Sequence, residues 1–146
     1  MMRFLLVLML PFFLHAKMLE VGESVAIKTL ASQHEQKFTL PKSGIWIVTW
    51  DKLTTRSANE YFKKHPMPKD VSLIVDVSQV PFGIFGMFVK PDMQKYAHPI
   101  LLSFDETYNR TFPYKEGNLT VLVVENQILQ KILFLENQED LEKFFK

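Results

Sequence analysis

The chain has 146 residues, with 17 lysines and arginines against 16 aspartates and glutamates, and it contains no cysteine. A balanced charge without a basic stripe argues against nucleic acid as a partner. The lack of cysteine excludes thiol-disulfide exchange by this chain's own side chains, cysteine nucleophiles and cysteine-based metal centres.

The first 16 residues have the pattern of a secretory signal peptide. Arg3 supplies a positive charge, residues 4–14 are apolar apart from Pro11, and Ala16 is a small residue suited to cleavage. The apolar run is shorter than the roughly 20 residues that cross a bilayer, and a retained membrane anchor is the alternative. We therefore expect export to a bacterial periplasm, leaving residues 17–146 as one domain without a stable membrane span.

The first predicted elements of this domain are strands. Residues 25–30 and 36–40 have the composition of two short strands around a polar turn, which predicts an N-terminal β-hairpin. Residues 45–50 follow Gly44 and are apolar on both faces, which is typical of a strand buried on both sides.

A helix is expected next, starting at Thr54. Apolar residues recur there at helical spacing until Pro66 stops the element. Ser57 and Glu60 have the spacing of a capping box, in which each side chain accepts a hydrogen bond from a free backbone N–H.

The later elements complete an alternating pattern. Residues 71–77 and 99–104 are predicted strands, and the segment 80–96 between them is expected to be helical in part. Residues 119–124 and 128–135 flank a short polar link of hairpin length. A short helix starting after Asn137 closes the chain. This order predicts an α/β domain with a mixed sheet, parallel early and antiparallel late, covered by helices on both faces.

The order of elements resembles the thioredoxin fold, a three-layer α/β architecture. Members of that family have a buried strand ending in Phe-Trp, then three residues, then Cys-x-x-Cys at a helix start. Here Thr49 and Trp50 end the strand, residues 51–53 follow, and Thr54, Thr55, Arg56 and Ser57 occupy the four active-site positions. The resemblance also places the family's buried acid at Val48 and its cis-proline near Leu119, so these features of the redox site are replaced as well.

Shorter motifs resemble the YtfJ-type family of small periplasmic proteins. These proteins have a signal peptide and a thioredoxin-like domain without the redox pair. The matching segments are residues 55–60, 86–90 and 119–130 with the closing helix. The resemblance covers most of residues 17–146 and implies a periplasmic protein of poorly defined function.

The helix start is the candidate binding site. Free backbone N–H groups and Arg56 could bind an anionic or carbonyl group there, although two threonines and a serine are also ordinary helix caps. Together with Leu119 and Thr120, residues 54–57 would form a groove. We expect this groove to bind a protein or peptide in a protein without redox activity. The alternative is a hydrolase or transferase with an oxyanion or phosphate site there, which requires Asp51 or a histidine near Ser57.

An apolar segment offers a second candidate surface. Phe82, Phe85 and either Phe88 or Val89 could lie on one buried helix face. The alternative is a partner-binding patch formed by these three rings and Met87, because Gly83 and Gly86 make the segment adaptable.

The remaining polar residues show no catalytic or metal-binding pattern. His34, His65 and His98 lie in separate predicted elements without metal-ligand spacing, which favours structural roles. The acidic pairs 105–106 and 139–140 are expected on the solvated surface. The sequence predicts no metal and no cofactor, and it leaves the oligomeric state open.

Overall fold

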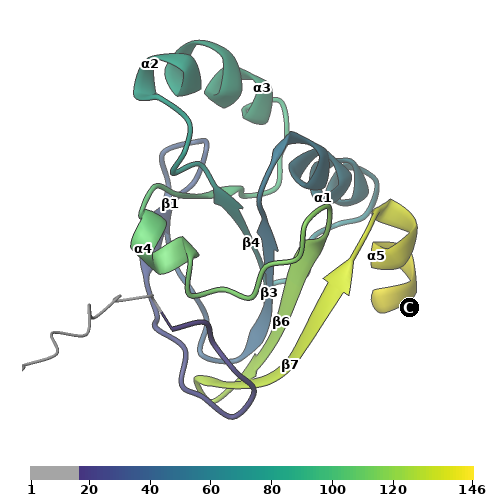
Figure 1. Cartoon of the computed structure of the whole chain (residues 1–146). Helices are drawn as coiled ribbons and strands as arrows, with labels where there is room; N and C mark the ends of the chain where they lie inside the picture. The colour runs from purple at the N-terminus through teal and green to yellow at the C-terminus, as the bar shows by residue number, and fades with distance from the viewer. Residues whose placement is uncertain (1–16) are drawn as a thin grey trace, which may run out of the picture.

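A computed structural model describes residues 17–146 (Figure 1), so the expected signal peptide over residues 1–16 lies outside the described residues. The N-terminal hairpin consists of β1 (Thr29–Ala31) and β2 (Lys37–Thr39), paired antiparallel. It is shorter than expected because Val25 is bonded elsewhere: its N–H donates to the Gln127 carbonyl. Residues 25–28 therefore do not extend β1.

A five-stranded mixed sheet forms the centre of the domain, in the order β5-β4-β3-β6-β7. The central strand β3 (Gly44–Thr49) is parallel to β4 (Val71–Asp76) and antiparallel to β6 (Leu119–Glu125). β5 (Leu101–Ser103) is parallel to β4, and β7 (Ile128–Leu135) is antiparallel to β6. The predicted mixed sheet is confirmed, with parallel pairing early and antiparallel pairing late.

Side-chain alternation along β3 supplies both faces of the sheet. Ile47 packs in the cluster that includes Ala58 and Leu141 of the helices α1 (Lys52–Lys64) and α5 (Gln138–Phe144). The neighbouring Trp46 and Val48 lie in the other cluster. Because successive residues of a strand point to opposite faces, an uninterrupted apolar run requires cover on both sides.

The second face is covered by a short helix that the sequence analysis missed. α4 (Glu106–Asn109) follows β5, and the carboxylate of its N-cap Asp105 accepts a hydrogen bond from the Tyr108 N–H. Tyr108 and the following Phe112 are buried against Trp46 and its neighbours. The acidic pair 105–106, expected only as solvated surface, therefore starts a helix.

The segment between β4 and β5 is a helix of three successive parts, seen at the top of Figure 1. α2 (Phe82–Ile84) leads into η1 (Phe85–Val89), a π-helix, and then into α3 (Lys90–Met93). Only Phe85 of the three expected core rings is buried, because Phe82 and Phe88 remain 78% and 67% exposed. The expectation of one buried face that carries Phe82 with Phe85 is wrong.

The start of α1 also differs from its prediction. The helix begins at Lys52, and its capping box joins Asp51 and Thr54: the Thr54 N–H donates to Asp51 Oδ1 at 2.8 Å, and the Asp51 N–H donates to the Thr54 hydroxyl at 3.2 Å. The predicted Ser57–Glu60 box is wrong, and Glu60 instead accepts a hydrogen bond from the Tyr96 hydroxyl. None of the helices within residues 17–146 combines the length and the apolar character that a membrane span requires.

Candidate binding site

Trp50 lies at the centre of the candidate site, just after the end of β3. Its indole N–H donates to the Thr120 hydroxyl at 3.1 Å, and that hydroxyl donates to the Pro113 carbonyl at 2.6 Å. The Tyr114 ring packs edge-on against the indole, with 5.2 Å between ring centroids. These contacts fix the indole at the carboxyl ends of the central strands, the region where α/β sheets commonly bind ligands.

The predicted groove residues differ in how far they are buried. Thr54 is buried in the capping box, and both Leu119 and Thr120 have no exposed surface. Thr55 is half-buried and bonded to the Thr49 hydroxyl, whereas Arg56 is exposed. Ser57 is half-buried as well. Burial therefore leaves Thr55, Arg56 and Ser57 to face a ligand, and ligand binding by the predicted set stays a prediction.

Ser57 has none of the surroundings that the hydrolase alternative needs. Asp51 Oδ1 is engaged by the N–H and the hydroxyl of Thr54. Within residues 17–146, no hydrogen bond joins the Ser57 hydroxyl to Asp51 or to a histidine. The base that would activate a hydroxyl nucleophile is thus not in place.

A cavity of about 510 Å³ opens beside the first turns of α1; we call it the α1 cavity. Its polar lining includes Thr55, Arg56 and Asn59 of α1. Apolar side chains that follow β4 form one wall: Val77, Val80, Phe88, Val89 and Met93. Further polar side chains come from other elements, among them Asp76 of β4, Gln79 and Tyr96. The cavity therefore combines an apolar wall with polar groups from several elements, as small-molecule sites do.

Tyr96, which also lines the α1 cavity, and the nearby His98 are both hydrogen-bonded to side chains of α1. The Tyr96 hydroxyl donates to Glu60 Oε1 at 2.9 Å, and burial and this carboxylate raise the pKa of Tyr96. Asn59 is buried, and its Oδ1 is bonded to His98 Nε2 at 2.8 Å. Burial lowers the pKa of His98 from 6.5 to about 4, so this histidine is neutral at pH 7. His98 thus has the structural role that the sequence favoured.

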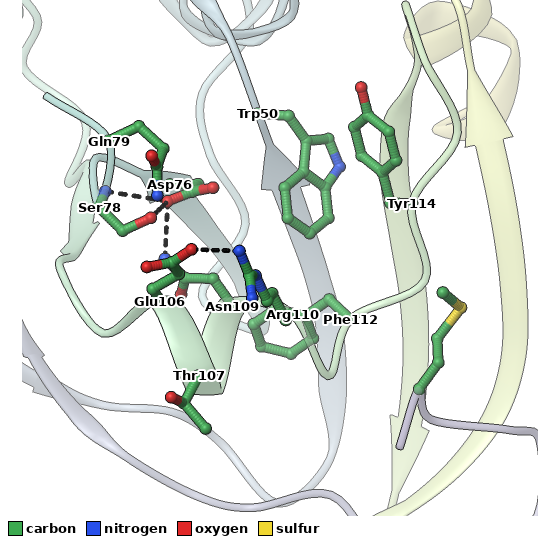
Figure 2. A pocket seen from close by; sticks show the side chains of 11 residues that line it. Trp50, Asp76, Ser78, Gln79, Glu106, Thr107, Asn109, Arg110, Phe112 and Tyr114 are labelled. Atoms are coloured by element: carbon green, nitrogen blue, oxygen red, sulfur yellow. Dashed lines mark hydrogen bonds and ion pairs between the residues drawn. The ribbon is translucent and has the colours of Figure 1, made fainter. Parts of the chain in front are cut away.

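A second cavity, of about 710 Å³, lies between Trp50 and α4; we call it the α4 cavity. Figure 2 shows Trp50 and Tyr114 on one side, with Asp76 and Ser78 across from them. Asp76 is the last residue of β4 and lines both cavities, as Trp50 does. Asp76 was not identified from the sequence, although an acid at the end of a buried strand is a signal of a site at that edge of the sheet.

The apolar patch predicted around residues 82–88 is mostly on the surface. Phe82, Met87 and Phe88 are exposed, and Phe82 stacks on the half-exposed Phe104 with 5.4 Å between ring centroids. Phe85 is buried beneath them. That this surface contacts a partner stays a prediction. In the part of the chain that the structure describes, no group of three or more acidic or histidine side chains is placed to hold a metal ion.

Solved structures resemble this fold. The StoA protein of Bacillus subtilis superposes with a TM-score of 0.58 at 16% identity, covering 83% of this chain and 97% of that one. A candidate protein disulfide isomerase of Bacteroides thetaiotaomicron has a TM-score of 0.56 at 14% identity, covering 86% and 85%. The C-terminal domain of a candidate thiol-disulfide oxidoreductase of the same organism has a TM-score of 0.54 at 16% identity, covering 86% and 93%. These likenesses show the thioredoxin-like fold.

No family model and no curated protein sequence matches the chain. The prediction of a protein without redox activity that binds a protein or peptide is corrected by the solved structures. Two of them are named for disulfide chemistry. The hydrolase or transferase alternative is not favoured by these structures or by the surroundings of Ser57. Any redox-related function must operate without a cysteine in this chain.

Proposed function

We propose that the chain has a redox-related function as a binding domain for a small disulfide or thiol that carries a carboxylate. The ligand occupies the α1 cavity, with its carboxylate at Arg56 and its sulfur-bearing body against the apolar wall. The observation that carries the proposal is an exposed arginine at an apolar-walled cavity. The sulfur atoms belong to the ligand, because the chain has no cysteine.

The charges at the α1 cavity support a carboxylate at Arg56. Arg56 has no acidic partner within 4 Å among residues 17–146, and guanidinium groups bind carboxylates in paired hydrogen bonds. Of the acids that line the cavity, Asp51 caps α1 and Asp92 is paired with Lys95 at 3.2 Å. The third acid, Asp76, keeps its negative charge, but Lys52 of α1 also lines the cavity and adds a second positive charge.

The apolar wall supports a sulfur-bearing body. Met93 is buried in the wall, and Phe88 lines the same cavity while remaining 67% exposed. Thioether and aromatic side chains make favourable contacts with polarisable sulfur. The cavity also lies at the helix start where the resemblance places the redox pair of the thioredoxin fold, which supports a ligand of disulfide or thiol class.

Calorimetric titration with oxidised lipoate, lipoamide and octanoate tests the proposal. Lipoate should bind best, because lipoamide lacks the carboxylate and octanoate lacks the disulfide. Loss of a charge-assisted hydrogen bond costs about 1.5–3 kcal/mol, so Arg56→Ala should weaken lipoate binding about tenfold or more. Arg110→Ala, which removes an arginine outside the α1 cavity, is the matched control and should bind lipoate normally.

Two results would contradict this proposal. If lipoate shows no saturable binding, the cavity does not hold this ligand class. If octanoate binds as tightly as lipoate, the cavity holds organic acids without regard to the disulfide, and the redox-related part is wrong.

The export of the chain and its membership of the YtfJ-type family are also proposals. They rest on the apolar run 4–14 and on the motifs at 55–60 and 86–90. Expression of the full chain in a bacterium, followed by intact-mass measurement of the periplasmic fraction, tests the first. A mass corresponding to residues 17–146 would support cleavage after Ala16.

A further inference from the structure

The α4 cavity has an aromatic side that is held in place. Trp50, Phe112 and Tyr114 line it. The hydrogen bond from the indole N–H to Thr120 and the edge-on packing of Tyr114 at 85° fix the two outer rings. The faces of tryptophan and tyrosine rings carry negative potential and attract cations, tryptophan most strongly.

Across the cavity, the Asp76 carboxylate is anchored through one oxygen. Its Oδ1 accepts hydrogen bonds from the Ser78 N–H at 2.9 Å, from the Ser78 hydroxyl at 2.6 Å and from Asn109 Nδ2 at 2.8 Å (Figure 2). Asn109 is itself buried and donates also to the Ser103 carbonyl at 3.1 Å. Within residues 17–146, Oδ2 of Asp76 receives no hydrogen bond. One oxygen of a rigidly held carboxylate is therefore left for a ligand.

The remaining charges of the α4 cavity leave Asp76 uncompensated. Two other charged side chains line the cavity, Glu106 and Arg110, and they form an ion pair with each other across one turn of helix. Within residues 17–146, Asp76 has no cationic partner within 4 Å. The cavity therefore has a net negative charge opposite an aromatic wall.

We propose that the α4 cavity binds an organic ammonium cation. The charged nitrogen lies beside Asp76 Oδ2, and its carbon substituents pack against Trp50 and Tyr114. Carboxylate and aromatic groups on opposite sides of a cavity are the arrangement that recognises alkylammonium ions. This ligand is distinct from the carboxylate-bearing ligand of the α1 cavity, and its charge is of opposite sign.

Titration with choline, followed by calorimetry and by tryptophan fluorescence, tests the proposal; the chain's other tryptophan, Trp46, is fully buried. The matched neutral compound is 3,3-dimethylbutan-1-ol, which has the same shape without the positive charge. Choline should bind saturably and about tenfold or more tightly than the alcohol. Equal affinities for the two compounds, or no saturable choline binding, would overturn the proposal.

Variants locate the binding site. Asp76→Asn keeps an oxygen to accept the Ser78 and Asn109 hydrogen bonds, and it should weaken choline binding about tenfold while circular dichroism shows an unchanged fold. Tyr114→Leu should weaken it about threefold or more. Arg56→Ala should leave choline affinity unchanged. Unchanged affinity in folded Asp76→Asn would contradict the assignment to this cavity.

Discussion

Gly44 starts β3, where the strand passes close to Asp70 at the end of the loop before β4. A Cβ atom added there would lie 2.3 Å from the Asp70 carbonyl oxygen, which accepts the Ile45 N–H at 2.8 Å. The carbonyl cannot move without breaking the hydrogen bond that leads into the parallel pairing of β3 and β4. The glycine is thus required by a close approach of two backbones.

We predict that Gly44→Ala lowers the free energy of unfolding by about 2 kcal/mol or more, through this clash and backbone strain. Urea denaturation followed by circular dichroism measures the loss. Gly22→Ala is the matched control: Gly22 has a positive φ of 92° but no atom near the added Cβ, so its loss should be smaller. If the two variants lost the same free energy of unfolding, the cause would be the positive φ of the glycine and not the clash with Asp70.

At the scale of elements, the helical segment 82–93 has a sequence with low helix propensity. It contains Gly83 and Gly86, yet it is helical throughout, with a π-helical turn closed by the Lys90 N–H bonding to the Phe85 carbonyl. π-helical turns are rare and often lie at functional sites. This one carries Phe88 and Val89 to the wall of the α1 cavity.

We predict that Gly83→Ala and Gly86→Ala each stabilise the protein by about 0.5–1 kcal/mol. A Cβ at either position meets no atom within 4 Å, and alanine loses less backbone entropy than glycine in a helix. Thermal and urea unfolding measure the change. Gly117→Ala is the control, because its site is equally open but its φ of +75° disfavours alanine, so it should destabilise. A loss of stability in Gly86→Ala would mean that the π-helical turn requires glycine.

At the scale of the whole molecule, His98 joins three parts of the chain. Its ring is hydrogen-bonded to Asn59 of α1 and packs against Phe62. Its backbone carbonyl oxygen accepts a hydrogen bond from Gln33 Nε2 at 2.8 Å. Gln33 belongs to the loop of the N-terminal hairpin and also binds the Ile100 N–H at 2.7 Å. Because His98 connects these parts, its protonation should change the free energy of unfolding of the whole domain.

We predict that this histidine makes the protein less stable in mild acid. Its pKa of about 4 in the folded state lies below 6.5, the ordinary value, so the unfolded state binds more protons between these two pH values. The contribution of neutral His98 to the free energy of unfolding is fully present above pH 6.5. It decreases as the pH falls towards 4 and does not change further below that pH. The expected loss is about 2 kcal/mol by pH 4.5.

Urea unfolding at pH 7.5 and 4.5 checks this prediction. His98→Gln, which can still donate to Asn59, should show a smaller loss of stability between the two pH values than the wild-type protein. His34 is exposed, and the variant His34→Gln serves as the matched control. Its free energy of unfolding should decrease between pH 7.5 and 4.5 by as much as that of the wild-type protein. An identical pH dependence for His98→Gln and wild type would contradict the assignment.

The sheet and its main helices could be predicted because their signals are local. The strand expected at 45–50 is found at 44–49, and the pair expected at 119–124 and 128–135 is found at 119–125 and 128–135. Apolar runs and alternation depend only on neighbouring residues. α4 was missed because four residues give too short a periodic signal, and Asp105 alone marks its start.

The candidate site was predicted less completely. Arg56 and Thr55 were identified from their position after Trp50, and both line the α1 cavity. Asp76, Asn109 and Tyr114 were not identified, because nothing in the sequence near them shows that they come together. Their approach depends on the order of the strands and on the placement of α4.

The sequence by itself determined the thioredoxin-like order of elements and the absence of cysteine, since both follow from the identity of residues along the chain. Only the tertiary structure decided which polar groups are exposed. It buried Thr54, Leu119 and Thr120, left Arg56 exposed, and placed Trp50 opposite Asp76. The physical reason is that burial and hydrogen-bond partners are set by contacts between distant segments, which no local pattern specifies.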